Sequence, residues 1–201
     1  MRFLLVEADK DDQCQPLTCT RSLGECNVAN RPLMDLQVES LTAAGFHSAA
    51  AGEGDGEFTL HVRQNAWLSS VLLAELAAVN EVSLRVSAAD NEGAIMAWLS
   101  QTPEIPVAGS LRACDADSFV VHYPWDLLRV NEQVVGALNH DLMAGALSPA
   151  AAVDGHLVLG EGSRVLPGVY IEGNVIIGRN CKIGPNCYIR GNTSIGDGVH
   201  I

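Results

Sequence analysis

The sequence predicts two domains of different class, a small α/β domain followed by an all-β parallel β-helix. Over residues 1–143, short apolar runs typical of strands alternate with amphipathic patterns typical of helices, which indicates an α/β fold. From Val153 to Ile201 the chain repeats every six residues without a break, a period characteristic of a parallel β-helix. A segment rich in small residues, 144–152, separates the two patterns and is predicted to be a linker.

The elements of the first domain follow from the periodicity of its apolar residues. Apolar runs predict strands at residues 2–7, 46–50, 58–62, 81–86 and 118–122. Helical patterns are expected at residues 32–44, 68–79, 92–99 and 124–142. Pro32 suits the start of its helix and Gly45 suits the end of it. This order of elements predicts a partly parallel sheet.

The repeat fixes which side chains of the second domain face inward. The first position of every unit is aliphatic, and these residues are Val153, Leu159, Val165, Ile171, Ile177, Ile183, Ile189, Ile195 and Ile201. The fifth position is small or aliphatic and includes Cys181 and Cys187, which we expect in the core. Outer faces are expected to carry Tyr170, Tyr188, Lys182 and Arg190. Because Ile201 opens a new unit, we expect a missing segment or a partner to cover that end.

Composition restricts the partners of the protein. The chain has 201 residues and a formal net charge of −12, which argues against nucleic acid or an anionic membrane as a partner. Neither a signal peptide nor an apolar stretch long enough to span a membrane is present in the sequence. Its six cysteines lack the paired spacing of a zinc site, and free thiols without a secretory signal predict a cytoplasmic protein.

The N-terminal motifs resemble those of the sugar-1-phosphate nucleotidyltransferases. The resemblance rests on Pro16-Leu17-Thr18, on Val28-Ala29-Asn30-Arg31-Pro32 and on the segment HYPWDLLRVNEQVV at 122–135. It implies a Rossmann-like domain followed by a left-handed β-helix. It also implies transfer of a nucleotidyl group from a nucleoside triphosphate to a sugar 1-phosphate, with Mg²⁺ as the metal.

Several functional positions depart from the family pattern. The polar loop after the first strand, residues 8–15, lacks the family's phosphate-binding glycines, and Leu23 lies near the place of the catalytic lysine. We therefore expect Lys10 and Arg21 as the catalytic cations. Arg31 and Ala8 are the expected nucleotide-binding residues, and Asp9 and Asp12 the expected metal ligands. These departures also leave open a degenerate domain with a structural or regulatory role.

Two alternatives place the function elsewhere. β-Helices of this type usually form trimers whose grooves hold acyl-coenzyme A, so the second domain could be an acyltransferase or acetyltransferase. A histidine commonly acts as the general base in such enzymes, and the candidates are His156 and His200, with no assignment between them. The other alternative is a non-catalytic scaffold that trimerises through the β-helix.

Overall fold

The computed structural model describes residues 1–7, 14–49, 58–79, 86–89, 93–102, 104–105, 110–113 and 115–201. The chain divides into two compact units. The first contains residues Met1–Cys26 and Pro32–Pro124, and the second contains Asn27–Arg31 and Trp125–Ile201. No helix in the described ranges is long and apolar enough to cross a membrane.

The first unit is built on a six-stranded sheet in the order β4-β1-β5-β8-β7-β9. Its strands are β1 (Arg2–Val6), β4 (His47–Ser48), β5 (Thr59–Arg63), β7 (Val86–Ala89), β8 (Ile95–Ser100) and β9 (Ser110–Ala113). Strand β1 runs parallel to both β4 and β5, whereas β8 is antiparallel to β5 and β7. The sheet is therefore mixed, and the predicted parallel part consists of β4, β1 and β5, with a further parallel pair in β7 and β9.

Two helices of the first unit contribute to one core on one side of this sheet. They are α1 (Leu33–Ala43) and α2 (Ser70–Ala77), both close to their predicted positions. Leu41 of α1 and Leu73 of α2 join Phe3, Leu60 and Val62 of the strands in a single cluster of buried side chains. Because these described helices share one core and the sheet is mixed, the Rossmann-like arrangement is not confirmed.

The predicted helix at 92–99 is wrong, because this segment contains β8. Residues Ile95–Ser100 read IMAWLS, a continuous apolar run that suits either a buried helix or a buried strand. Antiparallel pairing with both β5 and β7 decides for the strand. Of the strand predicted at 81–86 only Val86 is described, as the first residue of β7, and the predicted turn at 52–56 lies outside the described residues.

Short elements complete the N-terminal part. They are the 3₁₀ helix η2 (Leu23–Glu25), the paired strands β2 (Asn27–Val28) and β3 (Arg31–Pro32), and the antiparallel pair β6 (Ala66–Trp67) and β10 (Phe119–Val120). The tip of the β2–β3 hairpin, Ala29 and Asn30, has positive φ angles. The hairpin belongs to the second unit. The Asn30 side-chain amide donates a hydrogen bond to the Ile195 carbonyl at 2.7 Å, which fixes the hairpin tip to the solenoid.

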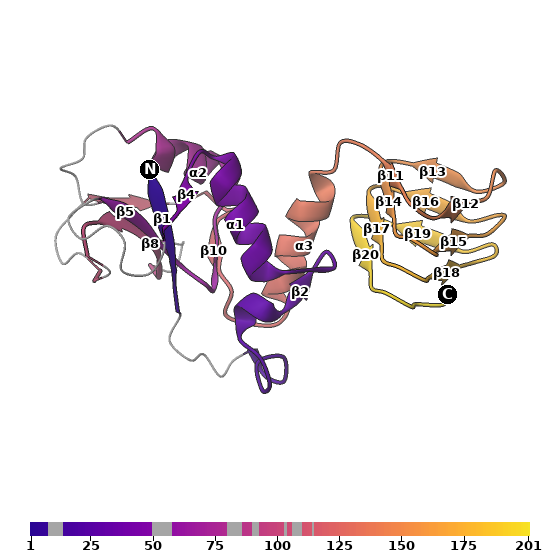
Figure 1. Cartoon of the computed structure of the whole chain (residues 1–201), viewed down its shortest axis with the longest axis horizontal. Helices are drawn as coiled ribbons and strands as arrows, with labels where there is room; N and C mark the ends of the chain where they lie inside the picture. Colours follow the sequence, from indigo (N-terminus) through magenta and orange to yellow (C-terminus); the bar gives the residue numbers. More distant parts are fainter. Residues whose placement is uncertain are drawn as a thin grey trace. The chain divides into compact units, whose positions relative to one another are not determined.

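The second unit is a parallel β-solenoid of about three turns (Figure 1). Its strands are β11 (Leu142–Met143), β12 (Ala146–Leu147), β13 (Ala152–Asp154), β14 (Leu157–Leu159), β15 (Arg164–Val165), β16 (Tyr170–Glu172), β17 (Val175–Ile177), β18 (Lys182–Ile183), β19 (Tyr188–Arg190) and β20 (Thr193–Ile195). They form three parallel sheets, β11-β14-β17-β20, β12-β15-β18 and β13-β16-β19. Leu157 pairs with Val175 and Val175 with Thr193, so each coil contains 18 residues, or three six-residue units.

The inward and outward positions of the solenoid are those that the repeat predicts. The buried cluster contains Leu157, Leu159, Val165, Val169, Ile171, Val175, Ile177, Cys181, Ile183, Ile189 and Ile195, all from first or fifth positions. Cys187 is partly buried against this cluster, while Tyr170, Tyr188, Lys182 and Arg190 are exposed. Stacked aliphatic layers from successive coils therefore supply the core of this unit.

The solenoid begins before the predicted linker. Leu142 of β11 pairs with Val158, and Ala146 of β12 pairs with Arg164, so residues 142–147 already belong to the coils. The sequence repeat does not reveal this first turn, because its β11–β12 connection is two residues shorter than the corresponding β14–β15 connection. Helix α3 (Asp126–Gly136) ends well before the predicted residue 142.

Candidate functional site

The residues predicted to bind nucleotide and metal are only partly described. Ala8, Asp9, Lys10 and Asp12 lie outside the described residues. Arg21 is exposed in the turn before η2, in the first unit. Arg31 is exposed in β3 and belongs to the second unit.

The described part of the chain contains no metal centre. Within the described ranges, no group of three histidine, cysteine or carboxylate side chains is placed to hold a metal ion. The predicted ligands Asp9 and Asp12 are outside those ranges. The Mg²⁺ site therefore stays a prediction.

The second unit brings a histidine and a carboxylate together at one corner of its first coils. His156 precedes β14, and its Nδ1 lies 3.3 Å from Oδ1 of Asp141, which precedes β11. The same Asp141 oxygen accepts a hydrogen bond from the Leu157 backbone N–H at 2.9 Å. Parallel pairing of β11 with β14 is what places these two residues beside each other. A carboxylate at Nδ1 leaves Nε2 of the imidazole as the proton acceptor when Nδ1 carries the proton.

Asn174, one coil further on, holds the backbone around this pair. Its Oδ1 accepts a hydrogen bond from the His156 N–H at 2.9 Å. Its Nδ2 donates to three carbonyls at the end of α3 and beyond it, those of Val135, Gly136 and Leu138, at 3.1–3.2 Å. The end of α3 and the coil that carries His156 are thus tied to one side chain.

The pair is charged on the carboxylate side and open to ligands. Hydrogen bonds, first from the Leu157 N–H and then from the His156 ring, lower the pKa of Asp141, so this carboxylate stays ionised at neutral pH. The side chains of His156 and Asp141 are 41% and 58% exposed, which leaves the imidazole accessible to a substrate. An accessible imidazole oriented by a carboxylate is suited to general base catalysis.

The other histidine candidate has a different environment. His200 is exposed and bridges in parallel to Lys182 of β18. Within the described ranges no carboxylate forms an ion pair or hydrogen bond with it, so nothing there orients the ring as Asp141 orients that of His156. The repeat pattern does not point to Asp141, because the shortened first turn removes this residue from the six-residue register.

Comparison with known families identifies the repeats. Residues 156–191 and 175–201 match the model described as bacterial transferase hexapeptide (six repeats). A comparison with curated proteins finds no match. The match therefore covers the solenoid from His156 onward, and this segment is similar to the hexapeptide repeats of bacterial transferases.

Proposed function

We propose that the second unit catalyses acyl transfer from an acyl-coenzyme A thioester to a hydroxyl or amine acceptor. The observation that carries this proposal is the Asp141–His156 pair, an accessible imidazole with a carboxylate at Nδ1. The match of this segment to a transferase repeat family supports the same class of reaction.

In this reaction His156 acts as the general base and Asp141 as a positioning residue. Nε2 of His156 removes the proton from the acceptor O–H or N–H as that atom attacks the thioester carbonyl. The C–S bond then breaks, and the proton passes from the imidazolium to the departing thiolate, which gives the acylated acceptor and coenzyme A. Ionised Asp141 stabilises the imidazolium that forms between these steps.

The test is thiol release from acetyl-coenzyme A with the full chain and a panel of sugars and amino sugars. His156→Ala should lower the rate of acceptor-dependent release by on the order of 10²- to 10⁴-fold. His140→Ala is the matched control, because the exposed His140 ring contacts Asn139 and its electrostatic effect is the smallest of those that lower the pKa of Asp141. Equal rates for wild type and His156→Ala would exclude His156 as the base.

A second candidate function is nucleotidyl transfer to a sugar 1-phosphate by the first unit. The supporting observation is that β4, β1 and β5 are parallel and that residues 8–13 follow the carboxyl end of β1. Ligands of open α/β sheets usually bind beyond the carboxyl ends of parallel strands. Lys10 and Arg21 would act as catalytic cations, Ala8 would contact the nucleotide, and Asp9 and Asp12 would bind Mg²⁺.

Nucleoside triphosphate and Mg²⁺ separate this function from acyl transfer. If the first unit is an active nucleotidyltransferase, a nucleoside triphosphate with Mg²⁺ should raise the melting temperature of the protein. Addition of a sugar 1-phosphate should then cause release of pyrophosphate from the triphosphate. Lys10→Ala should abolish that release while leaving thiol release unchanged. A chain that gives neither activity and has a trimeric mass would be the scaffold.

A further inference from the structure

We propose that Asn174 is a positioning residue for the Asp141–His156 pair and that the C-terminal end of α3 is the anchor from which it holds both residues. Asn174 contacts neither reactant and acts only through its hydrogen bonds. The expected effect on the reaction rate rests on the proposed acyl transfer, whereas the effect on the geometry of the pair is measurable without any activity.

Asn174 occupies the same corner of the solenoid as His156, one coil later. Strand register places these two residues and Asn192 in one column of successive coils. A Cβ on Gly155, the residue before His156, would lie 2.4 Å from the carbonyl oxygen of Gly173, the residue before Asn174. The two coils are therefore in close backbone contact at this corner, and a short side chain can span from one to the other.

The histidine of the pair is held through its backbone. Oδ1 of Asn174 accepts a hydrogen bond from the His156 N–H at 2.9 Å. The next residue, Val175, donates its own backbone N–H to the His156 carbonyl, also at 2.9 Å. Both backbone groups of His156 are thus bonded to consecutive residues of the following coil. This fixes the Cα atom of His156, from which the imidazole extends.

The carboxylate of the pair is held by the same side chain through the end of α3. Nδ2 of Asn174 donates to the carbonyls of Val135, Gly136 and Leu138 at 3.1–3.2 Å. The last carbonyls of a helix lack the usual partners within the helix, so a side-chain amide is well suited to bind them. Leu138 lies three residues before Asp141, whose Oδ1 is 3.3 Å from Nδ1 of His156. One amide group therefore bonds to His156 at one end and to the segment that leads to Asp141 at the other.

Asn192, the next residue of the column, binds α3 without touching the pair. Its Nδ2 donates to Oε1 of Glu132 at 2.6 Å, and its carbonyl accepts a hydrogen bond from the Asn131 side chain at 3.1 Å. Neither of these contacts involves Asp141 or His156. Both asparagines therefore dock α3 on the solenoid, and of the two it is Asn174 that joins this docking to the pair.

The first test is the effect of substitutions on kcat and KM for thiol release from acetyl-coenzyme A by the full chain. Asn174→Asp keeps an oxygen for the His156 N–H, removes the three donated bonds and places a carboxylate at the negative end of the α3 dipole. We expect kcat to fall about 10- to 10²-fold, because a displacement of about 1 Å in a reacting group has an effect of this order. KM should change less than twofold. Asn174→Ala removes the same bonds without adding a charge and should lower kcat as well.

Asn192→Ala is the matched control for these variants. It removes one hydrogen bond between the same column and α3, and none to the pair. The helix keeps its bonds to Asn174 and the bond from Asn131 to the backbone of residue 192. We therefore expect kcat of Asn192→Ala to stay within twofold of the wild-type value.

The tautomer of the His156 ring gives a second readout that needs no activity. A carboxylate at Nδ1 favours the neutral tautomer that carries its proton on that nitrogen. Nuclear magnetic resonance of the ¹⁵N-labelled imidazole distinguishes this tautomer from the one protonated at Nε2. The Nδ1–H tautomer should predominate in wild type and in Asn192→Ala, and its share should fall in both Asn174 variants. Circular dichroism spectra equal to that of wild type would show that these variants are folded.

The two readouts separate this proposal from the proposed function. Wild type without thiol release would refute acyl transfer, and the ring spectra would then decide the positioning role by themselves. A wild-type share of the Nδ1–H tautomer in both Asn174 variants would overturn the positioning role, as would an unchanged kcat in an active protein. A wild-type ring that lacks this tautomer would overturn it too.

Discussion

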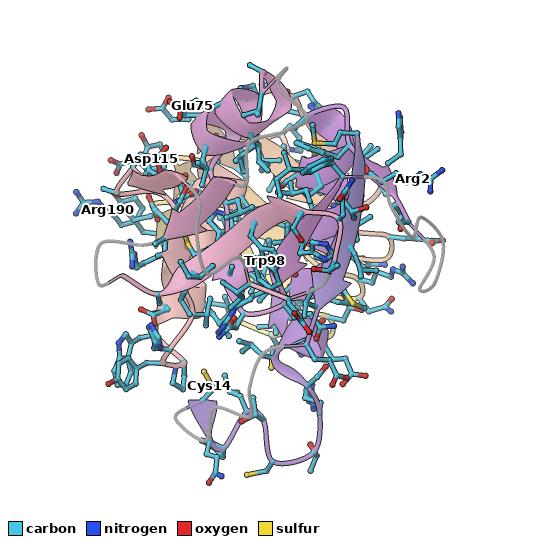
Figure 2. All side chains as sticks on the ribbon, turned by 90° about the vertical axis from the view of Figure 1, so that its left-hand side faces the viewer. Arg2, Cys14, Glu75, Trp98, Asp115 and Arg190 are labelled. Atoms are coloured by element: carbon cyan, nitrogen blue, oxygen red, sulfur yellow. The ribbon has the colours of Figure 1, made fainter. Side chains whose placement is uncertain are left out.

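His61 is a titratable side chain buried in the middle of the mixed sheet. It is 4% exposed and stacks on Trp98 of β8, with ring centroids 5.5 Å apart and an angle of 17° between the planes. Trp98 lies on the β8 ribbon near the centre of Figure 2. Burial lowers the pKa of His61 below 6.5, and the backbone of Ser100 opposes this shift in part.

This lowered pKa predicts how stability changes with pH. Below pH 6.5 the unfolded chain binds a proton at His61 that the folded chain does not bind until the lower, folded-state pKa is reached. The free energy of unfolding should therefore fall as the pH decreases below 6.5. His61→Phe keeps an aromatic ring against Trp98 and removes the titration, so urea midpoints measured at about pH 7.5 and about pH 5 should differ less in this variant than in wild type. An unchanged difference would show that other groups cause the pH dependence.

The charge of Asp141 can be removed without changing the shape of its side chain. Asp141→Asn retains the shape of the side chain and removes the charge that stabilises a protonated His156. We expect kcat for acyl transfer to fall on the order of 10²-fold with little change in KM. A variant that keeps the wild-type kcat would contradict a role for the Asp141 charge in the reaction.

Among the elements, the coils of the solenoid approach one another most closely at glycines. A Cβ on Gly160 would lie 2.3 Å from the carbonyl oxygen of Gly178 in the next coil, a contact with backbone that cannot rotate away. The same position one coil later is Gly178, where a Cβ would lie 2.8 Å from the backbone N of Asp197.

This close approach predicts the effect of adding a side-chain atom. Gly160→Ala should destabilise the second unit by about 1–3 kcal/mol, since the coils must move apart. Chemical denaturation followed by circular dichroism measures the loss. A variant as stable as wild type would show that the coil spacing at Gly160 does not limit stability.

Helix α3 illustrates how an element is ended by tertiary contacts. Its amphipathic pattern continues to Leu142, yet the helix stops at Gly136, where the Asn174 side chain binds the carbonyls of Val135 and Gly136. Asn131 adds a hydrogen bond from its amide to the Asn192 carbonyl at 3.1 Å. Contacts with residues 36 to 61 positions away in the chain therefore decide where α3 ends. The spacing of apolar residues within the helix carries no information about such distant contacts.

At the scale of the whole molecule, we expect a homotrimer formed through the solenoid. The chain has a mass of 21.3 kDa, so sedimentation equilibrium should give three times this value. A monomeric mass for wild type would exclude the trimer.

The sequence by itself determined the solenoid from Val153 onward, its inward positions and the α1 and α2 helices. It could do so because a period of six and a stripe of apolar residues are local properties, repeated often enough to outweigh any single exception. The tertiary structure alone decided that 95–100 is a strand, that the coils begin at Leu142, and that Asp141 lies beside His156 and Arg164 beside Lys182. These features depend on which segments pair, and pairing is a long-range property that the burial and register of the entire sheet determine.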